Sequence, residues 1–251
     1  MIMNKHTENN TVNTVNAVNS NLFAPERCIV DAVSAQRRAV KCTEGNNSRG
    51  EARNFKCLEF NGTVFKGEDL GYIEVHYSKF VDCQFEECKL YSMEAPFAEF
   101  INCTFKNCDL TNTDFSFAKI ANVQFLNCIL NSADFPFAQG DITCSNCTMI
   151  RFTAPNSVLR LKLDTVNAVS AEANQANLEL DITNSNFRRA EFNDSCIKGR
   201  ISQTNLTNAE FNRSSTELEL TDCAVNGLET EEAKDNELDC DLEELFSCDE
   251  E

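Results

Sequence analysis

A large apolar residue returns every five positions through the middle of this 251-residue chain. Sixteen of the seventeen positions taken at this interval from Phe55 to Phe135 hold a large or branched apolar side chain, and a small residue usually stands two positions earlier. An α-helix cannot use this spacing, because five-residue steps move the apolar positions around the helix and leave no buried face. A simple strand cannot use it either, because strand alternation has a period of two.

Positions twenty apart match better than positions five apart. A large and a small side chain two residues apart point the same way in an extended segment, and a turn in the remaining residues redirects the chain. Four such sides close a square coil of twenty residues, so that like side chains stack at the strand spacing of about 4.8 Å. The expected core series are Phe65, Phe85, Phe105 and Phe125; Leu70, Leu90, Leu110, Leu130 and Ile150; and Val75, Ala95, Phe115 and Phe135.

The repeating unit resembles that of the pentapeptide-repeat family, written Ala-(Asp/Asn)-Leu-x-x. Close matches are ADF at 133–135, ANL at 176–178, TNL at 204–206 and AEF at 209–211. The resemblance covers roughly residues 55–230 and implies an all-β fold, a right-handed quadrilateral parallel β-helix of roughly nine coils with short capping helices. The repeat frame shifts several times after Ile150, and each shift predicts a loop or a distorted corner.

The repeat divides the chain into four segments. Residues 1–24 are rich in Asn and Thr and nearly uncharged, which predicts a disordered leader. Residues 25–54 are expected to form an N-terminal capping helix and linker, because Pro25 suits a first helical position. Residues 55–230 form the β-helix, and residues 231–251 an acidic C-terminal helix or tail. Caps are needed because terminal coils otherwise expose apolar core and unpaired strand edges.

The net charge of −18 is unevenly placed, since residues 231–251 hold 11 acids and one base. The acidic balance argues against direct nucleic-acid binding, which needs basic surface, and permits a basic protein partner. No apolar stretch approaches the roughly 18 residues of a membrane span. The N-terminus also lacks the apolar segment of a secretory signal.

The 14 cysteines are interpreted as reduced thiols that serve as small core residues. Cys144-x-x-Cys147 has no second half for a tetrahedral zinc site; metal or redox chemistry is the alternative. His6 and His76 are the only histidines, and carboxylates on a convex face lack an enclosed environment. We therefore expect no enzymatic activity, no cofactor and no metal. Cysteines recur at multiples of twenty at the small inward position: Cys83 and Cys103, and Cys88, Cys108 and Cys128.

Two polar series at outward positions predict amide ladders along the stack. They are Asp82, Asn102 and Asn122, and Glu87, Asn107 and Asn127.

Four aromatic residues exceed what the fold requires. The second residue after each centre should face solvent, yet it is Tyr77, Phe97, Phe117 and Phe137 in four consecutive coils. These residues predict an aromatic stripe about 15 Å long on one outer face. Exposed apolar patches commonly mark binding sites, so the stripe is a candidate interface with a protein partner or a second copy of the chain. The alternative is that the N-terminal segment or a loop covers it.

The acidic tail holds a second candidate site. Leu242, Leu245 and Phe246 fall at helical spacing among dense carboxylates. They form either a C-terminal cap or a short motif that binds a groove on a partner.

Together these features favour a non-enzymatic scaffold that binds another protein. The polar start resembles the export signals of type III secretion effectors, several of which carry pentapeptide repeats, and this implies an effector made in the bacterial cytoplasm and delivered into a host cell. The family also implies an alternative, because some members bind DNA gyrase as acidic mimics of duplex DNA and protect it from inhibitors. The concentration of charge in the tail argues against gyrase binding, whereas the acidic rod argues for it.

Overall fold

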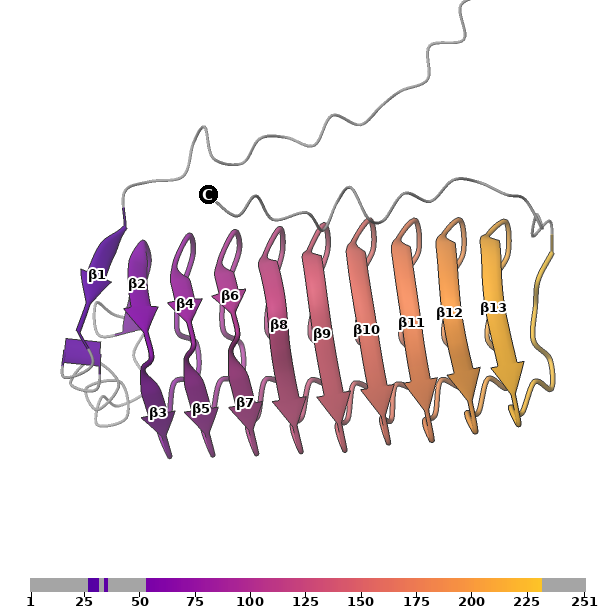
Figure 1. Ribbon diagram of the computed structural model, residues 1–251, viewed down its shortest axis with the longest axis horizontal. Helices are drawn as coiled ribbons and strands as arrows, with labels where there is room; N and C mark the ends of the chain where they lie inside the picture. Colours follow the sequence, from indigo (N-terminus) through magenta and orange to yellow (C-terminus); the bar gives the residue numbers. More distant parts are fainter. Residues whose placement is uncertain (1–26, 32–33, 36–52, 232–251) are drawn as a thin grey trace, which may run out of the picture.

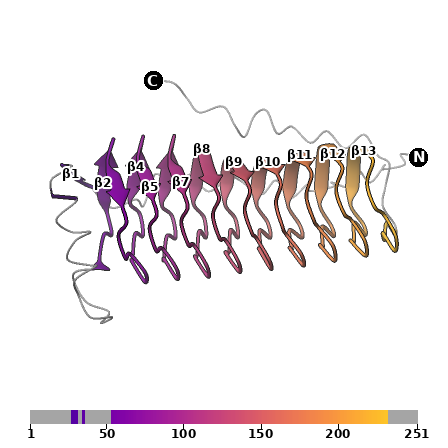
Figure 2. The same ribbon diagram turned by 90° about the horizontal axis from the view of Figure 1, so that it is seen from below.

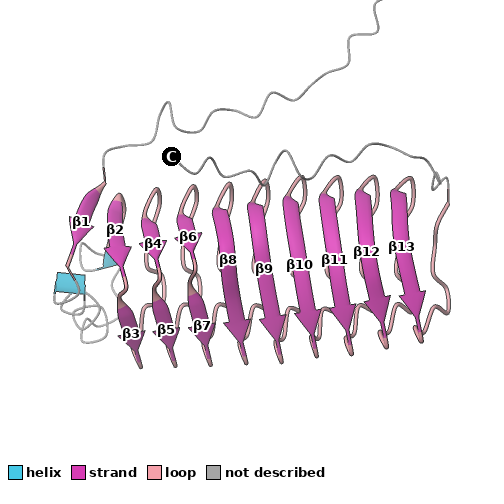
Figure 3. Ribbon diagram, in the orientation of Figure 1, coloured by secondary structure: helices cyan, strands magenta, loops and turns pink. Residues whose placement is uncertain are grey.

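The computed structural model describes residues 27–31, 34–35 and 53–231, and within them the chain winds into a parallel β-solenoid (Figure 1). Turned by 90°, the coils follow one another along a single axis (Figure 2). Strands and turns make up nearly all of the described chain, with almost no helix (Figure 3). This architecture confirms the predicted all-β, parallel β-helix class.

One side of the solenoid carries one strand per coil, nine from β2 to β13, with β1 added at the N-terminal end. A second row of short strands follows β2, β4 and β6. The long row is β1 (Cys28–Val30), β2 (Leu58–Asn61), β4 (Lys79–Val81), β6 (Glu99–Ile101), β8 (Lys119–Leu126), β9 (Gln139–Ser145), β10 (Val158–Asp164), β11 (Asn177–Thr183), β12 (Cys196–Ser202) and β13 (Ser215–Thr221). The short row is β3 (Val64–Lys66), β5 (Gln84–Glu86) and β7 (Thr104–Lys106).

Side chains of the same kind stack in the core, as the twenty-residue period predicts. The ring centroids of Phe65, Phe85, Phe105 and Phe125 are 4.8, 4.6 and 4.9 Å apart in sequence order. All four rings are buried, and backbone hydrogen bonds between coils hold them in register. The inter-coil spacing therefore sets both the backbone pairing and the ring stacking.

The coil shortens from twenty residues to nineteen at β8 and β9. Phe80 pairs with Phe100, twenty residues on, whereas Leu161 pairs with Leu180, nineteen residues on. The register shifts where β8 meets β9, and from β9 onward a single seven-residue strand replaces two short strands. The expectation of loops or distorted corners after Ile150 is therefore wrong for the side that carries β8 to β13, here called the long side. Each later coil has one residue fewer on this side, and its strand continues without a loop.

The shorter coil also moves one predicted core residue to the surface. The Leu130 amide donates to the carbonyl of Thr148, so Met149 stacks after Leu130 in the core. Met149 is buried and Ile150 is only half-buried. The prediction that Ile150 extends the leucine series is wrong because it assumed a constant period of twenty.

Two glycines lie where a long strand runs very close to the backbone of the preceding coil. Gly140 and Gly199 have φ angles of 132° and 128°, a region that other residues avoid. A Cβ atom on Gly199 would lie 2.0 Å from the Leu180 carbonyl oxygen, and one on Gly140 would lie 1.6 Å from the Ile120 carbonyl oxygen. The absence of a side chain lets both strands pair closely with their neighbours.

The N-terminal segment begins as a strand rather than as the expected helix. Cys28–Val30 pairs in parallel with β2 and covers its edge, because a strand edge offers unpaired backbone groups. Among the described residues up to Ala35, Ser34 and Ala35 are helical, and the Ser34 amide donates to the Asp31 carboxylate at 2.9 Å. The helix predicted from Pro25 is therefore wrong for residues 28–30.

The cysteine ladder lies where the repeat predicts it. Cys83, Cys88, Cys103, Cys108 and Cys128 are buried and carry free thiols. The Cys108 thiol donates to the Phe85 carbonyl at 3.3 Å. These thiols thus act as small core residues, as predicted.

The remaining cysteines refine this interpretation. Cys144 and Cys147 are both buried. Cys144 pairs with Phe125 in the register between β8 and β9, and Cys147 follows Cys128 one coil later. Cys196 departs from the expectation of reduced thiols, because it is disulfide-bonded.

Several predicted segments lie outside the described residues. They include the leader at 1–24, residues 232–251 of the tail, and with them Leu242, Leu245 and Phe246. No helix in the described part of the chain is long and apolar enough to cross a membrane.

We expect Gly199→Ala to destabilise the solenoid by at least about 2 kcal/mol, because the new methyl group meets a backbone oxygen at an unfavourable φ. The measurement is chemical denaturation followed by circular dichroism. Gly62→Asn is the matched control, since Gly62 faces open space at φ 57° and Asn102 occupies the same corner two coils later. Equal midpoints for the two variants would contradict the argument.

Core packing also predicts a pH dependence. The hydrogen bond with Cys128 and burial raise the pKa of Cys108 to about 12, against about 8.5 for an unfolded cysteine. Between these values the unfolded chain loses a proton that the folded chain keeps, so stability falls as the pH rises above about 8.5. We expect a shallower fall for Cys108→Ala, by up to about 1.4 kcal/mol per pH unit, in denaturation curves from pH 8 to 11. Parallel curves for the two proteins would contradict a role for this thiol.

Candidate functional site

The four aromatic residues predicted to form a stripe do so. The rings of Tyr77, Phe97, Phe117 and Phe137 stack with centroids 5.0, 4.8 and 4.8 Å apart and planes within 7° of parallel. Tyr77 is half-buried, and the three phenylalanines are 37, 45 and 46% exposed in sequence order. The stack therefore presents a row of ring edges to solvent on successive coils.

Each stripe residue occupies the third position of a tight turn. The Ala98 amide donates to the Ala95 carbonyl at 3.1 Å, with Pro96 and Phe97 between them, and Phe97 has a φ of 58°. Proline followed by a residue with positive φ is the pattern of a type II turn, which favours glycine or asparagine at the third position. The same hydrogen bond and φ recur at Phe117 and Phe137.

Many corners elsewhere in the solenoid carry asparagine, glycine or another short polar residue. The corner one side earlier carries Tyr72 and then Ser92, Asn112 and Ser132, at φ angles of 53–59°. The predicted Asn ladders also occupy positive-φ corners: the Asn102 amide donates to Asp82 and the Asn122 amide to Asn102, each at 3.1 Å, and Asn127 donates to Asn107 at 3.2 Å. Short polar side chains tolerate this backbone and pair along the stack.

Stability alone gives a weak reason for aromatic residues at the stripe. A left-handed backbone costs a residue with a side chain roughly 1–2 kcal/mol, and a stacked aromatic pair returns roughly 0.5–1.5 kcal/mol. The two terms nearly cancel, while each phenylalanine ring keeps more than a third of its surface in water. The stripe thus has the exposure of a contact surface and little effect on the fold.

The stripe ends where the coils shorten. The residues that follow Phe137 at the same corner are polar or charged: Asn156, Gln175, Asp194 and Arg213.

The N-terminal segment contacts one end of the stripe. The Arg27 guanidinium donates to the Tyr77 carbonyl and to the Glu99 carboxylate, each at 2.8 Å. Phe97, Phe117 and Phe137 remain exposed, since no described segment lies over them. Among the described residues, then, the predicted intramolecular cover reaches only Tyr77.

A column of carboxylates runs beside the stripe, and the repeat pattern did not single it out. Three residues before each stripe position stands an acid, as at Glu94 before Phe97, and the series continues beyond the stripe. Backbone β-bridges between neighbouring coils place its members directly opposite one another. This acidic column is Glu74, Glu94, Asp114, Asp134, Glu172, Glu191, Glu210 and Glu229, interrupted by Thr153.

Other columns on the surface alternate in sign. Glu59 faces Lys79, which in turn faces Glu99, and Lys66 and Glu86 form an ion pair of 2.7 Å. Like charges directly opposite one another destabilise a sheet, so the acidic column lacks the alternation of sign that stabilises the other columns. It could have been found in the sequence by taking the residue before each centre instead of the centres alone.

Among the residues that the structure describes, basic partners for the acidic column lie at its N-terminal end. Lys56 pairs with Glu74, and His76 lies 3.2 Å from Glu94. From Asp114 to Glu229 the six carboxylates form no ion pair with any described residue. The stripe and the column together make an apolar edge flanked by negative charge, which suits contact with a basic surface.

Comparison with known proteins agrees with the repeat. Residues 78–153 match the family described as pentapeptide repeat region. No curated protein shows a significant sequence match to the chain.

Two solved structures are similar over most of their length. HetL, a pentapeptide repeat protein involved in heterocyst differentiation regulation from the cyanobacterium Nostoc sp. strain PCC 7120, is 14% identical, with a TM-score of 0.41, over 72% of this chain and 89% of its own. Full-length QnrB1, a plasmid-mediated fluoroquinolone resistance protein, is 19% identical, with a TM-score of 0.29, over 77% of this chain and 92% of its own.

Residues 78–153 therefore carry pentapeptide repeats, and the same five-residue unit and stacked coils continue on both sides of them.

Proposed function

We propose that the protein is a non-enzymatic scaffold that binds another protein through the aromatic stripe. The observation that carries this proposal is the presence of four aromatic residues at turn positions that favour glycine or asparagine. Their rings remain exposed and contribute little net stability. Aromatic residues are enriched at protein interfaces, where they supply large contact area at low entropic cost.

We further propose that the protein is a bacterial effector delivered into host cells, with the stripe as its contact with a host protein. The Asn- and Thr-rich start at residues 1–24 supports this proposal through its resemblance to type III export signals. Under it, residues 1–24 are needed for delivery and the stripe for the target. The two requirements can be tested separately.

The stripe is tested with Phe97→Asn, Phe117→Asn and Phe137→Asn combined, because asparagine suits the positive φ at these corners. We expect an unchanged circular dichroism spectrum and at least about a tenfold loss in recovery of the partner. The measurement is affinity capture from bacterial and eukaryotic lysates in parallel, with bound proteins identified by mass spectrometry.

The matched control is Ser92→Asn with Ser132→Asn, which alters the equivalent turn position at the preceding corner. It should recover the same partner as the unmodified protein. A eukaryotic partner lost only with the stripe variant supports an effector. A partner retained by that variant contradicts the stripe as the contact surface.

The acidic column favours a second function, in which the protein binds DNA gyrase by imitating duplex DNA. Its eight carboxylates form one line along the rod, as phosphates do along a strand, and six of them have no basic partner among the described residues. This function requires the column and not the stripe.

Neutralising part of the column tests the second function. We expect Glu172→Gln, Glu191→Gln and Glu210→Gln combined to raise the unfolding midpoint, because like charges no longer face one another. If the column imitates DNA, the same variant should lose at least about tenfold in affinity for purified gyrase, while the stripe variant should keep it. Equal gyrase binding by all variants, or no binding by the unmodified protein, would contradict DNA mimicry.

A further inference from the structure

The C-terminal coil leaves an edge without a partner among the described strands. β13 pairs with β12 on one side and ends the strand order. Leu220 and Val225 are 43% and 44% exposed, whereas Ile201 and Leu206, their counterparts one coil earlier, are each 1% exposed. The edge therefore combines an apolar cross-section with a strand whose residues from Thr216 to Thr221 can accept another strand.

The long side that leads to this edge carries charges that alternate strand by strand. β10 presents Arg160 and Lys162, which face Glu179 and Asp181 of β11 in the register. β11 in turn faces Lys198 and Arg200 of β12. Along each strand the two charged residues are two positions apart and share one face.

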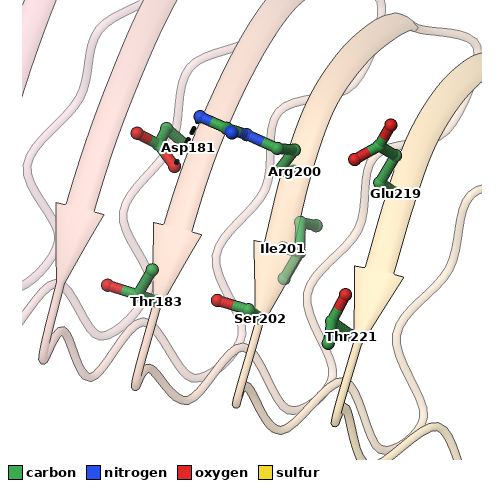
Figure 4. Close-up of a pocket in the computed structure, with 7 residues that line it drawn as sticks. All are labelled: Asp181, Thr183, Arg200, Ile201, Ser202, Glu219 and Thr221. Atoms are coloured by element: carbon green, nitrogen blue, oxygen red, sulfur yellow. Dashed lines mark ion pairs between the residues drawn. The ribbon is translucent and has the colours of Figure 1, made fainter.

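Ion pairs connect these rows. Arg160 lies 2.9 Å from Asp141 and 3.0 Å from Glu179, so one cation bridges the acids of two neighbouring strands. Arg200 points to Asp181, 3.9 Å away, and away from Glu219 (Figure 4). Each interior row thus lies between two rows of opposite sign.

The last row, Glu217 and Glu219 on β13, breaks this arrangement. It faces Lys198 and Arg200 on one side and no described strand on the other. A strand that continued the alternation would place a cation opposite Glu217 and another opposite Glu219. Apolar residues between them would face the core and cover Leu218 and Leu220.

Neither this chain's tail nor a second copy supplies that charge. Residues 232–251 hold one basic residue, Lys234, among ten carboxylates. A second copy meeting edge to edge would bring Glu217 and Glu219 against the same two acids, and like charges directly opposite destabilise a sheet. The charge of the edge selects a different protein.

We propose that β13 is a docking edge for an extended segment of a partner protein in which Lys or Arg alternates with apolar residues. The segment adds to the sheet as a further strand, with its cations beside Glu217 and Glu219 and its apolar side chains on the exposed core. Backbone pairing supplies affinity, and the alternation of charge and apolar side chains supplies specificity. The edge lies on the long side of the rod, and its use is independent of the aromatic stripe.

The test uses the full chain and three synthetic peptides, blocked at both ends. The first alternates Lys or Arg with Leu, the second has the same composition without alternation, and the third has Glu in place of every cation. Affinity is measured by calorimetry, and the site by hydrogen exchange of the β13 amides. We expect the alternating basic peptide to bind at least about tenfold more tightly than the other two and to protect residues 215–221.

Charge reversal at the edge completes the test. Glu217→Lys with Glu219→Lys should lose about tenfold in affinity for the alternating basic peptide and gain affinity for the acidic one. Asp82→Lys with Glu87→Lys is the matched control, because it changes the net charge equally at two exposed acids near the other end of the rod, outside the acidic column. It should bind like the unmodified protein, and circular dichroism verifies the fold of both variants.

Three results would overturn the proposal. The first is failure of the unmodified protein to bind any peptide. The second is an equal loss of affinity in the control variant, which reveals attraction by net charge alone. The third is slow exchange of the β13 amides without peptide, together with a higher unfolding midpoint for the Glu217→Lys, Glu219→Lys variant, which indicates that the acidic tail occupies the edge.

Discussion

The structure depends on the hydrogen bonds between successive coils. Each coil pairs with the next through backbone groups, as where the Leu70 amide donates to the Lys89 carbonyl at 2.7 Å. This pairing places every residue directly over its counterpart one coil away, at the strand spacing of about 4.8 Å. A side chain is therefore tolerated only if it can stack on its neighbours in the same column.

Columns, and not single residues, are consequently the units that carry stability. Phe65, Phe85 and Phe105 fill the core because rings stack well at this spacing. Asn102 and Asn122 suit exposed corners because their amides pair along the axis and tolerate a positive φ. Columns that depart from these rules are the informative ones, and both the stripe and the acidic column do so.

The change of coil length shows how the same rule operates where the repeat is imperfect. A coil that loses one residue must still place its remaining residues over those of the previous coil. The loss is confined to the long side, where two short strands become one and Gly140 passes over the Ile120 carbonyl. The other sides keep their five-residue period, so Met149 and Phe152 stay in the core. One consequence is a continuous row of seven-residue strands from β9 to β13 that bears the alternating charges.

Much of the fold was predictable from the sequence, because a five-residue period admits few structures. The phenylalanine columns, the thiol ladder and the alignment of Phe97, Phe117 and Phe137 all follow from counting in fives and twenties. The position of the second candidate surface, β13 with Glu217 and Glu219, did not follow, since it depends on a nineteen-residue register that the shifted frame concealed. The start of the N-terminal cap was likewise beyond sequence patterns, because Cys28–Val30 becomes a strand only when β2 offers its edge.

By itself, then, the sequence determined the coil, its core and the residues that reach the surface in columns. These properties depend on side-chain size and period alone. Only the tertiary structure decided which columns place like charges opposite one another, where the coil shortens and which strand ends the described sheet. Those properties depend on register between coils, and register is set by backbone pairing over the whole solenoid.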